Sequence, residues 1–166
     1  MRSFLVEIDQ LREKKILTDK QHRVMRDFYE NYKEASSHLP DQNRLERMLE
    51  QLIELSLEQV KNPHQFSIFH RSIRTPFDYY QFGLDFIRPF IDFSQSQVYG
   101  LENLTKIQQQ LTRKENVILL ANHQTEPDPQ IISLMLEKID SILATDMIFV
   151  AGHRVITDPM AIPFSL

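Results

Sequence analysis

The first 61 residues constrain the fold most, because apolar side chains recur in them every three or four positions in three separate runs. This spacing gathers the apolar side chains on one face of an α-helix. Thr18-Asp19 offers a cap for the second helix, Pro40-Asp41 separates it from the third, and Asn62-Pro63 ends the third. No one of these helices can cover its apolar face alone, so residues 1–75 are predicted to form a small helical bundle. The predicted buried positions are Phe4, Ile8, Leu11, Val24, Met25, Phe28, Tyr32, Ala35, Leu45, Met48, Leu49, Leu52, Ile53 and Val60.

Aromatic side chains crowd the next segment, from Phe66 to Phe93. Phe82, Phe86 and Phe90 are spaced by four, which predicts a helix over 77–88 that Pro89 bends or ends. So dense an aromatic run favours packing in a core over a contact surface for a membrane or an acyl chain.

After Gly100 the pattern alternates between helical stretches and short continuous apolar runs. Residues 101–114 and 129–139 have helical character. Residues 116–121 (NVILLA) and 147–151 (MIFVA) resemble strands that are buried on both faces. This order of helix, strand, helix and strand predicts a parallel layer.

The fold class predicted is therefore α/β, with the helical bundle of residues 1–75 followed by the start of an α/β domain over 76–166. Such a sheet needs more than two strands, and the sequence reaches Leu166 soon after the second apolar run. We therefore expect the α/β domain to be incomplete in this chain.

The composition narrows the classes of function. The formal net charge is -4, which gives no basic footprint of the kind that binds a phosphodiester backbone, so nucleic acid is not an expected partner. The chain has no cysteine, which excludes disulfides, a thiolate metal site and a thiol nucleophile within it. No apolar run approaches the roughly 18 residues that span a bilayer. We expect a soluble intracellular protein without a transit peptide and with at most peripheral membrane contact.

One stretch carries candidate chemistry, VILLANHQTEPDPQIISLMLE, in which a predicted strand leads through a polar loop into a helix. His123 lies at the end of that strand, where sites form in parallel layers. Asp128 precedes Pro129 and is predicted to cap the helix, and its carboxylate can accept a backbone amide and an imidazole N–H together. The aspartate would then orient the imidazole, whose other nitrogen can take a proton from an alcohol.

Donors for a developing negative charge are also present in this loop. Asn122, Gln124, Thr125 and nearby backbone amides are the candidates. A histidine and an aspartate five residues apart occur in many proteins, so the pair alone does not specify a reaction.

Longer segments supply that specificity. They closely resemble the soluble, plastid-type glycerol-3-phosphate acyltransferases, which also occur in some bacteria, at HRSIRTPFDYY, FDYYQFGLDFIRPFIDF, NHQTEPDP and FVAGHRVITDP. The resemblance implies direct transfer of a fatty acyl group from acyl carrier protein or acyl-CoA to the sn-1 hydroxyl of glycerol 3-phosphate. The family motif H-x-x-x-x-D falls on His123 and Asp128, which implies that these two are the catalytic residues. It also implies no cofactor or metal, and a location in the cytoplasm, or in the plastid stroma of a plant.

The chain departs from the family pattern in three places. Pro127 stands where the family usually has a small residue, and His153 stands where it usually has an acid. The basic cluster that binds the substrate phosphate in the family lies downstream of Leu166. We therefore expect these 166 residues alone, as about the first half of a longer enzyme, to be catalytically poor or inactive.

Two alternatives stay open. One alternative to acylation of glycerol 3-phosphate is a noncatalytic helical interaction module. The other is an acyltransferase that acts on lysophosphatidate, which the lack of a membrane-spanning segment in this sequence disfavours. His70, Arg71 and Arg74 form a small basic group, for which solvated charges are favoured over a contact with an acidic carrier protein. The remaining histidines lack ligand spacing, and packing or surface roles are expected for His22, His38 and His64.

Overall fold

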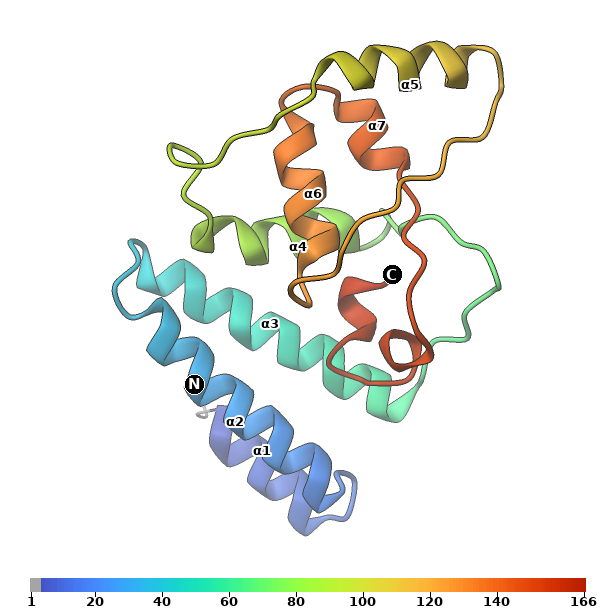
Figure 1. Cartoon of the computed structure of the whole chain (residues 1–166). Helices are drawn as coiled ribbons and strands as arrows, with labels where there is room; N and C mark the ends of the chain where they lie inside the picture. The colour runs from blue at the N-terminus through green and yellow to red at the C-terminus, as the bar shows by residue number, and fades with distance from the viewer. Residues whose placement is uncertain (1–3) are drawn as a thin grey trace. The chain divides into compact units, whose positions relative to one another are not determined.

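The computed structural model describes residues 4–166, and in this part of the chain every regular element is a helix (Figure 1). Two compact units are present, Met1–Phe90 together with Ile148–Leu166, and Ile91–Met147. The domain boundary expected after residue 75 stays a prediction. The helices, in chain order, are α1 (Phe4–Glu13), α2 (Asp19–Ser36), α3 (Gln42–Lys61), α4 (Tyr79–Ile87), η1 (Arg88–Phe90), α5 (Glu102–Thr112), α6 (Asp128–Glu137), α7 (Ser141–Asp146), η2 (His153–Ile156) and η3 (Ile162–Phe164).

The three N-terminal helices begin and end close to where the sequence predicts. Thr18 caps α2 through a reciprocal pair of bonds, in which the Gln21 amide donates to the Thr18 hydroxyl at 3.2 Å and the Thr18 amide donates to the Gln21 side chain at 3.0 Å. Asp41 caps α3 in a left-handed conformation (φ 58) by accepting the Arg44 amide at 3.2 Å. The predicted helices and the Thr18 cap are therefore confirmed.

The first unit has one apolar core, formed where α1, α2, α3 and α4 meet. Leu49 and Leu52 of α3 are fully buried within it. Phe164 of η3 packs against Phe82 and Phe86 of α4, with ring centroids 5.9 and 5.3 Å apart, which brings the C-terminal segment into the same core. Other members of this core are Phe4, Ile8, Met25, Leu45, Met48, Ile53 and Leu57. Two predicted positions are wrong, since Val24 is 42% exposed and Ala35 is exposed as well.

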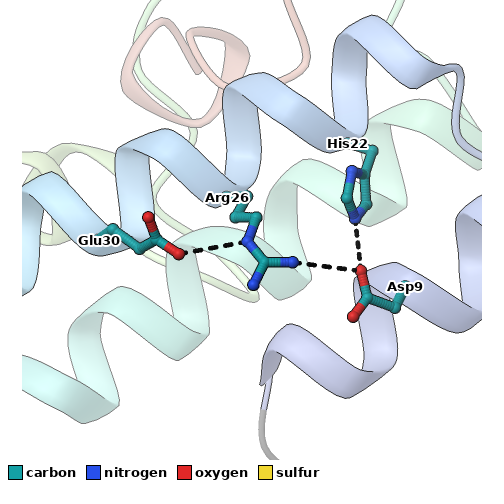
Figure 2. Close-up of polar contacts among 4 residues, drawn as sticks. All are labelled: Asp9, His22, Arg26 and Glu30. Carbon is teal, nitrogen blue, oxygen red and sulfur yellow. Dashed lines mark hydrogen bonds and ion pairs between the residues drawn. The ribbon is translucent and has the colours of Figure 1, made fainter.

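A polar network joins α1 to α2 beside this core (Figure 2). The buried His22 ring donates from Nε2 to Asp9 Oδ1 at 2.6 Å. Arg26 lies 3.6 Å from the same carboxylate oxygen and 3.2 Å from Glu30. The pKa of Asp9 lies below its ordinary value, chiefly because His22 donates to the carboxylate, and Arg26 adds to the effect. His22 thus has a structural role, consistent with the packing role expected for it.

The Asp9 contact has a pH signature. A carboxylate whose pKa is lowered on folding stabilises the fold above its unfolded pKa of about 3.9, and that contribution is lost as pH falls through the folded pKa. We expect Asp9→Asn to lower the midpoint of thermal unfolding at neutral pH, and the difference from the wild type to shrink in acid. Circular dichroism melts from neutral pH into acid measure this difference. Glu30→Gln is the matched control, because Glu30 makes an exposed pair with Arg26 that stabilises little.

Tyr32 of α2 is the one described residue with a buried side-chain polar atom that lacks a hydrogen-bond partner. Its ring packs against Phe86 at 4.8 Å and, edge on, against Phe90 at 5.4 Å. Burial raises the pKa of Tyr32 to about 12. A buried hydroxyl without a partner destabilises the fold, because it has lost its hydrogen bonds to water.

Removing this hydroxyl is therefore expected to be harmless. We expect Tyr32→Phe to leave the free energy of unfolding unchanged or to raise it by up to about 1 kcal/mol in chemical denaturation. Because the pKa is raised on folding, the wild type should also lose stability between about pH 10 and about pH 12, and the variant should lose less there. Tyr29→Phe is the comparison, since Tyr29 lies beside Lys33 and its hydroxyl is not an unpartnered buried group. A loss of more than about 1 kcal/mol in Tyr32→Phe would contradict this account and indicate a bound water.

The second unit contains α5, α6 and α7. Leu134 and Leu136 of α6 and Ala144 of α7 are buried, and α6 packs closely against α7. Asp140 caps α7 by accepting the Leu143 amide at 2.9 Å, and it also accepts the Gln108 side chain of α5 at 2.7 Å. The sequence predicts α5 and α6, but it does not predict α7.

The α/β prediction is wrong, since no strand and no sheet is present in residues 4–166. The predicted strands 116–121 and 147–151 have no strand to pair with within residues 4–166, and most of their side chains are exposed, with Leu120 at 94% and Val150 at 101%. A strand exists only when a neighbour accepts and donates its backbone hydrogen bonds, which a local apolar run cannot specify. A continuous apolar run therefore shows that a segment is hydrophobic, but it does not show that the segment pairs with another strand.

Candidate catalytic site

The loop that leads into α6 brings the two predicted catalytic residues together. His123 Nδ1 donates to Asp128 Oδ2 at 2.8 Å. Both residues belong to the unit Ile91–Met147. The contact that the motif predicts is thus present in the loop, while the catalytic roles of the two residues stay a prediction.

Asp128 does not cap α6 as expected. The helix begins at Asp128 itself, and Pro127 occupies the preceding cap position without a side-chain bond. The Asp128 carboxylate turns back to the loop instead, where Oδ2 accepts the backbone amides of Gln124 at 2.7 Å and Thr125 at 3.2 Å. The Asp128 amide in turn donates to the Thr125 carbonyl at 3.0 Å, so residues 124–128 form a closed turn.

These contacts fix the charge of Asp128. Its pKa lies below the ordinary value, chiefly because the Gln124 amide donates to it, with the Thr125 amide and His123 contributing further. The carboxylate is therefore ionised at neutral pH. Most of this stabilisation comes from the main chain, and His123 is a smaller cause.

The imidazole is oriented but open to solvent. Because Nδ1 donates to Asp128, the neutral ring carries its lone pair on Nε2. The His123 side chain is 69% exposed, whereas that of Asp128 is 20% exposed. Nε2 can therefore accept a proton from an external group while the carboxylate stays behind the ring.

Two of the expected donors for a developing negative charge are already engaged. The amides of Gln124 and Thr125 donate to Asp128, so they are not free to bind an oxyanion. This role could not be predicted from the sequence, because a backbone amide carries no side-chain signal. Asn122 and the side chains of Gln124 and Thr125 remain as candidates.

The His123 loop takes part in neither of two hollows on the first unit, and in no group of metal ligands and no membrane-spanning helix among the described residues. Hollows of about 360 Å³ along α1 and about 170 Å³ between α2 and α3 do not contain His123. Within residues 4–166, no group of three or more histidine, aspartate or glutamate side chains is placed to hold a metal ion. No helix in the same range is both long and apolar enough to cross a bilayer.

The second half of the chain, which contains the candidate site, matches a known protein family. A family model described as "Acyltransferase" matches residues 95–165, which contain both His123 and Asp128. The loop that holds His123 and Asp128 therefore lies inside the segment that matches the acyltransferase family.

Individual relatives narrow this class. The chain is 44% identical over 146 residues to a chloroplastic glycerol-3-phosphate acyltransferase of Cucurbita moschata, and the matched segment covers 86% of this chain and 31% of the relative. It is 44% identical over 115 residues to a chloroplastic glycerol-3-phosphate acyltransferase of Spinacia oleracea, and this match covers 69% of the chain and 24% of the relative. It is 41% identical over 145 residues to a chloroplastic glycerol-3-phosphate acyltransferase of Phaseolus vulgaris, and this match covers 86% of the chain and 32% of the relative. The predicted resemblance to glycerol-3-phosphate acyltransferases is confirmed, and the matched part of the chain spans about a quarter to a third of the length of these relatives.

The hydrogen bonds of the loop predict different consequences for the two residues. We expect His123→Ala to keep the closed turn, because the two backbone amides still hold Asp128. We expect Asp128→Ala to open it, so that the Gln124 amide exchanges with solvent about tenfold faster or more. Amide exchange measured by nuclear magnetic resonance compares the two variants directly. Equal acceleration in both would contradict the view that the main chain anchors Asp128.

Proposed function

We propose that the protein containing this chain transfers a fatty acyl group from a thioester to the sn-1 hydroxyl of glycerol 3-phosphate. One observation carries this proposal: His123 donates to an ionised Asp128 at 2.8 Å within the segment that matches the acyltransferase family. The names of the relatives support glycerol 3-phosphate as the acceptor. The donor proposed is acyl carrier protein or acyl-CoA, and the compartment is the cytoplasm, or the plastid stroma in a plant.

His123 is the proposed general base. Its Nε2 takes the proton of the acceptor hydroxyl as the hydroxyl oxygen attacks the carbonyl carbon of the thioester. The carbon–sulfur bond then breaks, and the leaving thiolate receives the proton from the imidazolium. An ester and a free thiol result, so atoms and charge balance without an acyl-enzyme intermediate. The absence of cysteine from the chain agrees with direct attack by the acceptor.

Asp128 is the proposed orienting residue. It keeps the proton of the neutral ring on Nδ1 and stabilises the imidazolium that forms when Nε2 is protonated. It does this as a carboxylate throughout, because the Gln124 and Thr125 amides favour its charged form. These amides therefore act as positioning groups, and the donors that stabilise the tetrahedral oxyanion must come from elsewhere.

The proposed role of His123 is tested with the intact protein. Free thiol released from acyl-CoA or acyl carrier protein should depend on added glycerol 3-phosphate, and His123→Ala should lower kcat by roughly two to four powers of ten. His38→Ala is the matched control, because His38 is another exposed histidine, just beyond the end of α2. Circular dichroism should show that both variants are folded.

Other outcomes separate the alternatives. Unchanged kcat in His123→Ala would rule out this residue as the base. Turnover with lysophosphatidate and not with glycerol 3-phosphate would change the acceptor but keep the chemistry. No turnover with any thioester in the intact wild-type protein would favour a noncatalytic interaction module.

A further inference from the structure

The end of the helix pair α1–α2 is rich in positive charge. Five of the 19 lysines and arginines of the chain fall within residues 12–23, against two carboxylates, Glu13 and Asp19, although the whole chain has a net charge of -4. These five cations are Arg12, Lys14, Lys15, Lys20 and Arg23. Figure 1 shows the blue turn that joins the two helices at this end. Positive charge is therefore concentrated at one end of the pair.

Four of these cations are not neutralised by a salt bridge. Arg12 is set aside, because it adds to the lowering of the Asp9 pKa that His22 and Arg26 cause. The other four are exposed, and within residues 4–166 no salt bridge involves Lys14, Lys15, Lys20 or Arg23. Even without Arg12, four cations against two carboxylates leave a net positive charge at this end of the helix pair.

The exposed side of α2 changes sign along its length. Lys20 and Arg23 are three residues apart, so they lie next to each other on one helix face. Further along the helix the exposed charges include the carboxylates of Asp27, Glu30 and Glu34. An anionic surface is therefore attracted to the end of the helix pair and repelled from the rest of this side.

One apolar side chain is exposed among these cations. Ile16 follows the two lysines of the turn and is 42% exposed. Its amide donates to the Leu11 carbonyl at 2.9 Å, and the Lys15 amide donates to the Arg12 carbonyl at 2.9 Å, which ends α1 with Lys15 in the left-handed conformation (φ 58). The next residue, Leu17, is buried. The turn that presents Ile16 and the lysines is therefore held by its own hydrogen bonds and by the core.

We propose that this basic tip, formed by Lys14, Lys15, Ile16, Lys20 and Arg23, docks the protein on the surface of an anionic lipid bilayer. The cations lie near the lipid headgroups, and Ile16 reaches the boundary between headgroups and acyl chains. Clusters of four or more lysines and arginines on amphipathic helices are typical of such contacts. Interfaces with folded proteins are instead poor in lysine, and three of the four cations are lysines. The inference does not depend on the proposed acyl transfer.

A contact of this kind depends on lipid charge and on salt. Each lysine or arginine near an anionic surface strengthens binding about fivefold, and added salt weakens this attraction. One isoleucine alone gives only weak binding to neutral lipid. The wild type should therefore bind vesicles that contain phosphatidylglycerol much more strongly than vesicles of phosphatidylcholine alone, and added salt should release it.

Vesicle flotation with the intact protein tests this proposal. We expect the double variant Lys14→Gln, Lys15→Gln to lower binding to phosphatidylglycerol vesicles about 25-fold. The matched control is Lys106→Gln, Lys114→Gln, which removes the same charge from two exposed lysines in and just after α5. Lys114 also matches Lys15 in its left-handed backbone (φ 60) beyond the end of a helix. This control should not change binding, and both double variants should keep the wild-type circular dichroism.

A second pair of variants tests the apolar part of the tip. We expect Ile16→Ser to lower binding to the same vesicles by a smaller factor, about threefold, because one partly exposed side chain is removed from the lipid boundary. Ile142→Ser is the matched control, since Ile142 is 74% exposed on α7. Binding of the control should equal that of the wild type.

Several results would overturn the proposal. One is equal binding of the wild type to neutral and anionic vesicles, and another is binding that survives in the Lys14→Gln, Lys15→Gln variant. Equal losses in the two double variants would show an effect of net charge and not of the tip. Capture of acyl carrier protein through Lys14 and Lys15, without any vesicle binding, would assign the tip to an acidic protein partner instead. Acyl transfer to soluble glycerol 3-phosphate in the absence of vesicles is measured separately, so failure of either proposal leaves the other open.

Discussion

The carboxylate of Asp128 receives three N–H groups from a single short loop, and the geometry of the candidate site depends on this interaction. Two donors belong to the backbone of Gln124 and Thr125, and the third is the His123 ring. The backbone donors lower the pKa of the aspartate and fix its position, so the histidine meets a carboxylate that is already charged and oriented. Orientation of the imidazole is therefore a property of the loop conformation and not of the His–Asp pair alone.

Local signals predicted the helices of this chain well. The cap at Thr18, the break at Pro40-Asp41 and the apolar spacing of α1, α2 and α3 agree with the structure, because these features act within a few residues. The short helix α7 was missed because six residues hold too little periodicity to stand out.

Features for which the residues had alternative hydrogen-bond partners were predicted poorly. The runs 116–121 and 147–151 have strand-like composition, but strand pairing requires a second segment, and no partner strand is present within the described residues. Asp128 followed by Pro129 has the composition of a helix cap, yet its carboxylate turns toward the preceding loop. In both cases the residues themselves were compatible with more than one set of hydrogen bonds.

Prediction of the candidate site depended on the longer resemblance and not on the spacing of two residues. A histidine and an aspartate five apart become informative only inside NHQTEPDP and its flanking segments, which the acyltransferase family match and the plant relatives support. Loss of His123 would remove the imidazole but leave the main-chain bonds to Asp128 in place. A descendant of this protein that had lost its histidine by drift would thus keep the same loop shape, and the course of the backbone alone would not reveal whether the candidate base is present.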